Sequence, residues 1–225
     1  ATDQIGSMYY TKESYDKLYP GYGSSYINFY GGAGFLFEQA SSRGHVQETS
    51  TIPITFAFTI RNQFTASLTT IRASLAEKAQ LLKMRKEFYR VAQSQAAASP
   101  IKGYVFGDTK DATRTNAFLS MLLLHEIEVY PVSSGITVEG KKFEAGKTYY
   151  VPTAQDNYIM VRSVFEKAIT YIDSSFYDAS AWSLIHAYNL PYAETKTALA
   201  KTNPITSIAA TETALTKSNY AYVLE

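Results

Sequence analysis

Glu38 is the residue of this 225-residue chain whose setting points most directly to chemistry. It is the one acidic side chain in the stretch GGAGFLFEQASSRG, residues 31–44, where it separates a run of small and aromatic residues from a polar turn. A carboxylate in such a place must be solvated, paired or used, because burying a lone charge is costly. Composition favours an ordinary pairing with Arg43, and the alternative is a general base.

A short strand is the element expected to position Glu38. Residues 33–37 are apolar or glycine and are bounded by turn-forming residues, which is typical of a fully buried strand, and Glu38 stands at its exit. Residues 52–60 alternate β-branched and aromatic side chains and predict an edge strand, since they include a proline. Asn62 is then the expected N-cap of a long helix that runs to about Val91.

The sequence around Glu38 resembles the catalytic strand of the carboxypeptidase A-like zinc peptidases, with a glycine-rich lead-in, FLFE and an arginine, Arg43, five residues on. The segments YPGYG at 19–23 and FEQAS at 37–41 look most like a bacterial branch of this family, in which a glutamine-amidotransferase-like domain follows the peptidase domain. In the family the glutamate is the general base that acts on zinc-bound water, so the resemblance assigns this role to Glu38. Arg43 would at most contact groups around the metal site.

The resemblance also implies a substrate-binding tyrosine. In the family, a tyrosine on a mobile loop before the catalytic strand closes over the substrate, and Tyr22 or Tyr19 is the nearest candidate here. The alternative for each of these tyrosines is a ring packed within the fold, with its hydroxyl group hydrogen-bonded.

The stretch QSQAAASP, residues 93–100, is small and polar and predicts a domain boundary. We expect residues 1–95 to form the C-terminal portion of a carboxypeptidase-like domain with a mixed sheet, and residues 96–225 to form a second α/β domain. Its order of strand, helix and strand favours a parallel sheet with a right-handed crossover, as in Rossmann-like and flavodoxin-like folds. Because the sequence becomes linker-like after residue 195, we expect that sheet to be incomplete or the chain to end early.

The elements expected in the second domain alternate in type. The predicted strands are 103–106, 128–132, a hairpin over 136–143, 147–151 and 220–224, and the predicted helices are 113–125, 157–169 and 182–188. This stretch, including YDASAW at 177–182, resembles the amidotransferase-like domain of the bacterial carboxypeptidases. Amidotransferase activity needs a cysteine nucleophile, and the chain has no cysteine, so we expect this domain to be catalytically inactive.

His125 and Glu128 form an H-x-x-E string, the pattern that supplies two zinc ligands in carboxypeptidases. In the family that pair comes before the catalytic glutamate, whereas here it follows Glu38. We therefore favour the alternative in which His125 ends a helix and Glu128 begins a strand. His45 and His186 have no partner at metal-ligand spacing, so no metal site is predicted in this chain, and zinc is expected only in a longer parent protein.

Composition removes several classes of partner. The net charge of +1 gives no electrostatic case for nucleic acid or for an anionic membrane surface. No apolar run approaches the roughly 18 to 20 residues that span a bilayer, so we expect no membrane insertion. The first residues lack the features of a signal peptide, so either a signal was removed or the chain is a fragment. A truncated domain would expose sheet edges, through which a homo-oligomer could form.

Two hypotheses follow. In the first, the chain is part of a periplasmic or secreted bacterial zinc carboxypeptidase-like protein that acts on peptides, with Glu38 as its general base, and is inactive as given because the zinc ligands are absent. In the second, it is a non-catalytic binding or assembly module of an exported protein. Glu38 is then structural, and the tyrosine-rich N-terminal region contacts a partner or glycan.

Overall fold

The computed structural model describes residues 1–9, 20–167 and 183–208. Its helices are α1 (Gly23–Tyr26), α2 (Phe56–Ala76), α3 (Lys78–Ala98), α4 (Ala112–Leu124), α5 (Tyr158–Phe165) and α6 (Leu184–Ala187), with 3₁₀ helices η1 (Asp3–Ile5) and η2 (Ile27–Tyr30). Its strands are β1 (Val46–Gln47), β2 (Ile54–Thr55), β3 (Gly103–Phe106), β4 (Tyr130–Pro131), β5 (Ile136–Val138), β6 (Lys141–Phe143), β7 (Tyr149–Pro152) and β8 (Tyr192–Thr195). The mixed α/β class expected from the sequence is confirmed.

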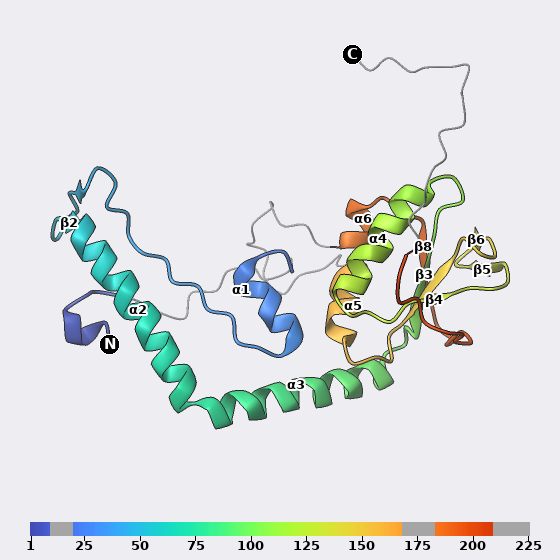
Figure 1. Ribbon diagram of the computed structural model, residues 1–225, viewed down its shortest axis with the longest axis horizontal. Helices are drawn as coiled ribbons and strands as arrows, with labels where there is room; N and C mark the ends of the chain where they lie inside the picture. The colour runs from blue at the N-terminus through green and yellow to red at the C-terminus, as the bar shows by residue number, and fades with distance from the viewer. Residues whose placement is uncertain (10–19, 168–182, 209–225) are drawn as a thin grey trace, which may run out of the picture.

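A four-stranded sheet with the order β4-β7-β3-β8 forms the centre of the C-terminal half (Figure 1). All of its pairings are antiparallel, and Val105 of β3 lies opposite Tyr150 on one side and Ala193 on the other. Strands β3 and β4 run in the same direction, because both are antiparallel to β7, which lies between them. The parallel sheet expected from the strand–helix–strand order is therefore corrected to an antiparallel one in the described residues. A later strand is inserted where the prediction paired β3 with β4.

The two faces of this sheet are covered differently. Helices α4, α5 and α6 cover one face (Figure 1), where Tyr104 and Phe106 of β3 meet Phe118 of α4 and Phe165 of α5 in the main hydrophobic core. The hairpin of β5 and β6 covers the other face and buries Val105 with side chains of β6, β7 and β8. Alternate residues of β3 thus point to opposite layers, as the pleat of a strand requires.

The predicted hairpin is confirmed, and its turn explains why it forms. Val138 lies opposite Lys141, which leaves Glu139 and Gly140 as a two-residue loop. Both loop residues have positive φ, 49° and 74°, which is the geometry of a type I′ turn. A glycine at the second position adopts this backbone without strain.

The predicted long helix is replaced by two helices that meet at Glu77. Asn62 is not the N-cap, because α2 begins earlier and Thr55 Oγ1 accepts the backbone N–H of Phe58 at 3.2 Å. Instead Asn62 lies inside α2, buried, and its Nδ2 donates to Ser7 Oγ at 2.8 Å. The edge strand expected over 52–60 is reduced to the two residues of β2.

Helix α3 continues through most of the stretch predicted as a linker. It ends at Ala98, and Ala92 and Ala96 pack against Tyr158 of α5. The small residues there form a close helix contact, which a composition-based linker assignment misses. The domain boundary near residue 95 stays a prediction.

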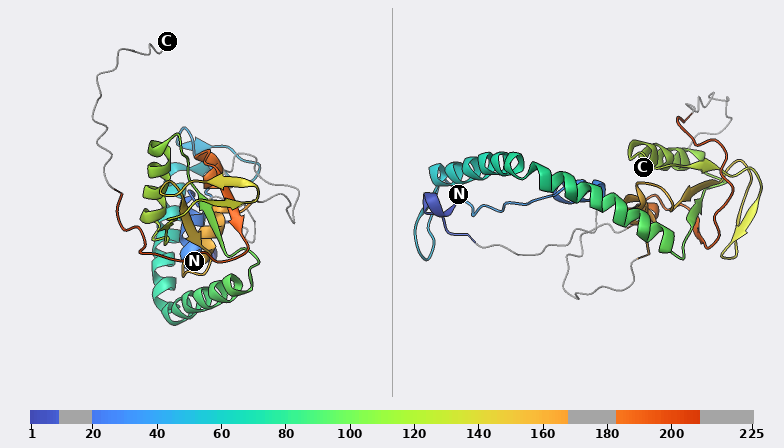
Figure 2. Two further views of the ribbon diagram at one scale, coloured as in Figure 1. Left: turned by 90° about the vertical axis from the view of Figure 1, so that its right-hand side faces the viewer. Right: turned by 90° about the horizontal axis from the view of Figure 1, so that it is seen from below.

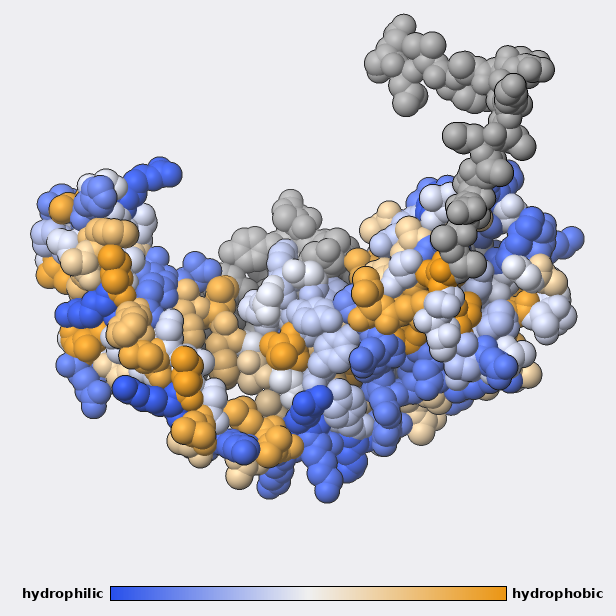
Figure 3. All heavy atoms as spheres, viewed as in Figure 1, coloured by the Kyte–Doolittle hydropathy of each residue, from blue (hydrophilic) through white to orange (hydrophobic). Residues whose placement is uncertain are grey.

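Helix α2 extends away from the sheet and buries little (Figures 1 and 2). Asn62 is its one buried residue. Four of its apolar side chains are 52 to 76% exposed; this α2 stripe consists of Ile60, Phe64, Ile71 and Leu75. Hydrophobic residues lie along α2 in the space-filling view (Figure 3). No helix among the described residues is both long and apolar enough to cross a bilayer.

Some predicted features lie outside the described residues or agree only in part. The YDASAW segment at 177–182 and the strand at 220–224 lie outside them. Helix α5 ends at Phe165, β4 is shorter than predicted, and α6 covers four residues, 184–187, of the helix predicted over 182–188.

Candidate functional site

Glu38 lies in an extended loop rather than at the end of a strand. Residues 33–37 have no regular secondary structure, so the predicted strand is wrong. Phe35, Leu36 and Phe37 are 67, 53 and 56% exposed, and no described strand pairs with them. A buried strand needs both a neighbouring ladder and a covering layer, and the described residues provide neither.

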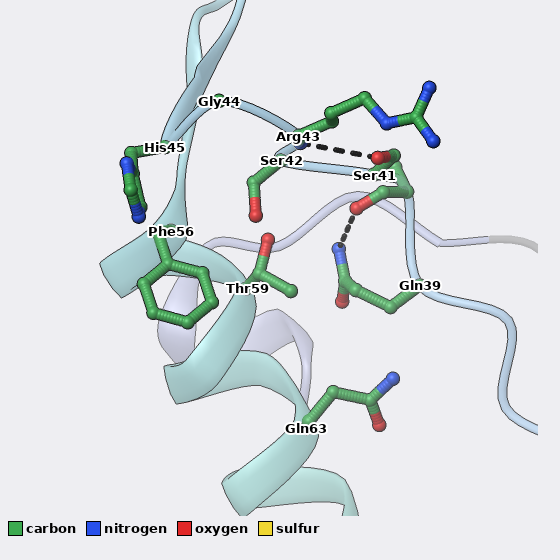
Figure 4. Close-up of a pocket in the computed structure, with 10 residues that line it drawn as sticks. Gln39, Ser41, Ser42, Arg43, Gly44, His45, Phe56, Thr59 and Gln63 are labelled. Atoms are coloured by element: carbon green, nitrogen blue, oxygen red, sulfur yellow. Dashed lines mark hydrogen bonds between the residues drawn. The ribbon is translucent and has the colours of Figure 1, made fainter.

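The carboxylate of Glu38 is exposed, and no hydrogen bond or ion pair joins it to another described residue. In particular, the expected pairing with Arg43 is not formed. Arg43 is also exposed, and its guanidinium group extends away from the loop, while its backbone N–H donates to Ser41 Oγ at 3.2 Å (Figure 4). The chain thus places a solvated, unpaired carboxylate in an open loop.

An open hollow of about 470 Å³ lies directly after Glu38, between the loop and the first turns of α2 (Figure 4). Its lining residues are Gln39, Ala40, Ser41, Ser42, Arg43, Gly44, His45, Phe56, Thr59 and Gln63. Three hydroxyl groups and two amides give it a polar wall, and Arg43 lines it with its guanidinium group turned outward. Thr59 Oγ1 is buried there without a hydrogen-bond partner among the described residues.

The far wall of the hollow is formed where the loop turns back into β1. Gly44 and His45 both have positive φ, 75° and 71°, and the His45 ring meets the Phe56 ring edge-on at 5.5 Å. The His45 ring therefore packs at the start of α2. The sequence did not predict this hollow, because its only signal is the polar composition of residues 39–44.

The two candidate substrate-binding tyrosines have different outcomes. Tyr19 lies outside the described residues. Tyr22 is the N-cap of α1, is 39% exposed, and accepts the backbone N–H groups of Ser25 and Tyr26 on its carbonyl oxygen. Its role toward a substrate stays a prediction.

The favoured interpretation of His125 is confirmed, because His125 is the C-cap of α4. The helix ends in a Schellman motif: Glu126 adopts φ 54°, and the N–H of Ile127 bonds to the carbonyl oxygen of Leu122 at 3.1 Å. Glu128 lies two residues before β4, and its carboxylate accepts the hydroxyl of Tyr130 at 2.7 Å. The H-x-x-E string therefore spans the end of α4 and the connection that leads to β4.

No three His, Asp or Glu side chains come together to hold a metal ion anywhere in the described ranges. The residues that the structure describes therefore do not fit a catalytic zinc site. What the structure does provide is an exposed carboxylate beside a polar hollow, on a loop whose apolar neighbours are uncovered. Comparison with known protein families, curated proteins and solved structures gives no match for this chain.

Proposed function

We propose that this chain is a part of an exported zinc carboxypeptidase-like protein, namely the last portion of its peptidase domain and the domain that follows, and that Glu38 is the general base of its peptide hydrolysis. The proposal starts from the resemblance of residues 31–44 to the catalytic strand of that family. Zinc and its ligands would come from another part of the protein, and the C-terminal half would serve packing or binding rather than catalysis.

The observation that carries the proposal is the uncovered apolar surface on both sides of Glu38. The four residues of the α2 stripe and the loop residues Phe35, Leu36 and Phe37 are all more than half exposed. At roughly 100 Å² each, these side chains expose on the order of 700 Å² in total, divided between the loop and the helix. Such a surface is usually covered, and a preceding part of the same peptidase domain would cover it.

The loop and the helix meet beside one of these residues, Phe35. Phe35 and Ala33 line the same hollow of about 380 Å³ as Thr70, Ser74 and other residues of α2 and α3. A covering layer on this side would therefore meet the loop and the helix together.

Glu38 needs little else from this chain to act as a base. Its carboxylate is exposed and unpaired within the described part of the chain, so it is free to accept a proton from an attacking water and pass it to the leaving amine. General acid–base catalysis of this kind contributes about 10²- to 10⁴-fold in rate. The hollow after Glu38, with its hydroxyl and amide groups, would lie beside the reacting bond.

The test uses this polypeptide and the longer reading frame that contains it. Alone, the chain should neither bind zinc stoichiometrically nor hydrolyse peptides, and tight zinc with turnover would refute the proposal. In the longer protein, Glu38→Gln should lower kcat by about 10² to 10⁴ with KM nearly unchanged and zinc retained. Glu48→Gln, an exposed acidic residue further along the chain, is the matched control.

The second hypothesis has its own signature. If the longer protein carries no zinc ligands, or if Glu38→Gln and Glu48→Gln are both silent, the chain is a non-catalytic binding or assembly module. The same uncovered surface would then be the contact for a partner.

A further inference from the structure

The segment from Gly23 to Gly34 folds into a tight corner just before the Glu38 loop. Helices α1 and η2 form its first half, and the N–H of Gly32 returns to the carbonyl oxygen of Ile27 at 3.0 Å. The N–H of Gly34 donates to Asn28 Oδ1 at 2.8 Å. A Cβ on Gly34 would lie 1.8 Å from the carbonyl oxygen of Ser24, so only glycine fits where the chain leaves the corner.

This corner is docked on the C-terminal half of the protein. Phe29 and Tyr30 pack against the main core. The hydroxyl of Tyr30 donates to the carbonyl oxygen of His125 at 3.1 Å, and the hydroxyls of Tyr26 and Tyr30 lie 3.2 and 3.3 Å from Nδ1 of the same residue. Burial raises the pKa of Tyr30, so its hydroxyl stays protonated and available as a donor.

His125 is itself held in place from a second helix. Asn157, the N-cap of α5, donates its Nδ2 to the carbonyl oxygens of His125 and Glu126 at 3.2 and 2.9 Å. The end of α4 is therefore a fixed platform between the corner and α5. The rings of Tyr26 and His125 are 5.6 Å apart, which adds an aromatic contact to the hydrogen bonds.

Helix α3 closes the corner from another side. Gly31 has φ 71°, and a Cβ there would lie 3.0 Å from the ring of Phe88. In Figure 1, α1 lies between the long helices and the layer of α4 and α5. The corner is thus wedged between two parts of the protein.

We infer that His125 is a positioning residue, which with Tyr26 and Tyr30 anchors the corner from which the Glu38 loop leaves. Four residue steps separate Gly34 from Glu38, so the carboxylate-bearing residue stays within about 14 Å of the anchored glycine. The C-terminal half, which has no nucleophilic cysteine, thereby gains a role in placing Glu38. The anchoring is a property of this chain, and only its effect on catalysis rests on the proposed function.

Hydrogen exchange of the Gly32 and Gly34 amides tests the anchor without a substrate, so its outcome is separate from that of the peptidase assay. His125→Leu should speed exchange of both amides about tenfold. His125→Asn should restore slow exchange, because its amide can meet the tyrosine hydroxyls near the position of Nδ1. The matched control is His186→Leu, since His186 Nε2 also pairs with a tyrosine, at 3.1 Å from the hydroxyl of Tyr192.

Three results would overturn the inference: unchanged exchange in His125→Leu, equal acceleration in His186→Leu, or no rescue by asparagine. If His125→Leu does not fold, the double variant Tyr26→Phe and Tyr30→Phe keeps every ring and removes only the hydroxyls. It should then accelerate both amides, and unchanged exchange in it would reject the anchor equally.

Discussion

The ring of Phe165 lies flat against the ring of Tyr104, with centroids 4.6 Å apart and planes 9° from parallel. This contact joins α5 to β3 at the centre of the main core. Phe165 also meets Phe118 of α4 edge-on at 5.7 Å, so one side chain ties two helices to the sheet. Stacked and edge-to-face aromatic pairs contribute about 0.5 to 1.5 kcal/mol each beyond the area they bury.

Phe165→Ala is expected to lower the free energy of unfolding by about 3 to 5 kcal/mol, because it removes a fully buried ring and leaves a cavity among four aromatic neighbours. Urea unfolding followed by circular dichroism measures this change. The control is Phe64→Ala on α2, where the ring is 64% exposed and the loss should stay below about 0.5 kcal/mol. Equal losses in the two variants would contradict the described core.

Glu126→Gly should stabilise the protein by about 0.5 to 1 kcal/mol. Glu126 holds φ 54° at the C′ position of α4, where glycine avoids the strain of a left-handed backbone. Glycine keeps the contact with Asn157, since that side chain donates to the backbone oxygen of residue 126. The midpoint of thermal unfolding should rise, whereas Glu144→Gly, at an exposed position outside any helix, should give no comparable gain.

The elements of the C-terminal half could be predicted from the sequence because each has a strong local pattern. Strand β3 begins and ends as predicted, and α4 differs by one residue at each end. The order of strands could not be predicted in this way, since the insertion of β7 between β3 and β4 depends on contacts far apart in the chain. The same holds for Ala96, which belongs to the stretch of small residues that indicates a linker until Tyr158 is seen packing on it.

The sequence indicates which residue of the candidate site to consider, but it does not predict the geometry around that residue. Glu38 is indicated by its setting, yet the strand that should carry it lacks a neighbour among the described residues. The docking of Tyr26 and Tyr30 on His125 joins residues almost a hundred positions apart, and only the clustering of tyrosines before residue 31 hinted at it. The sequence indicates a helix cap at Asn62, because nothing local shows that Ser7 lies beside it.

Acid should weaken the anchor formed by His125. Burial lowers the pKa of His125, so the folded state favours the neutral ring, and the stability that this gives is present above its ordinary value of 6.5 and is lost as the pH falls below it. The groups that face it are the hydroxyls of Tyr26 and Tyr30, and Glu126, together with Tyr89 of α3, acts electrostatically on Tyr30.

Wild type should therefore lose stability relative to His125→Asn as the pH is lowered from 7.5 toward 5, because asparagine does not titrate. Urea unfolding midpoints at each pH measure it. The pH at which the His125 ring titrates should lie below its ordinary value in NMR spectra. A difference that stays constant over this range would contradict the burial of the ring.

The outer edge of β8 is protected by the turn of the hairpin, which bears on any association through sheet edges. Lys141 Nζ donates to the carbonyl oxygen of Tyr192 at 2.8 Å, and the N–H of Glu194 donates to Glu139 Oε2 at 3.4 Å. An unprotected edge is a template for pairing with another chain, and these two side chains occupy its donor and acceptor groups.

Glu139→Ala combined with Lys141→Ala should therefore increase self-association through β8, because the edge groups of Tyr192 and Glu194 become available to another chain. Sedimentation velocity over a range of concentrations should show at least a severalfold larger fraction of dimer than in wild type. Exchange of the Glu194 amide should also become faster in dilute solution. Lys142→Ala, exposed on the same hairpin, is the matched control and should leave both unchanged. If the double variant associates no more than this control, the side chains of the turn do not guard the edge.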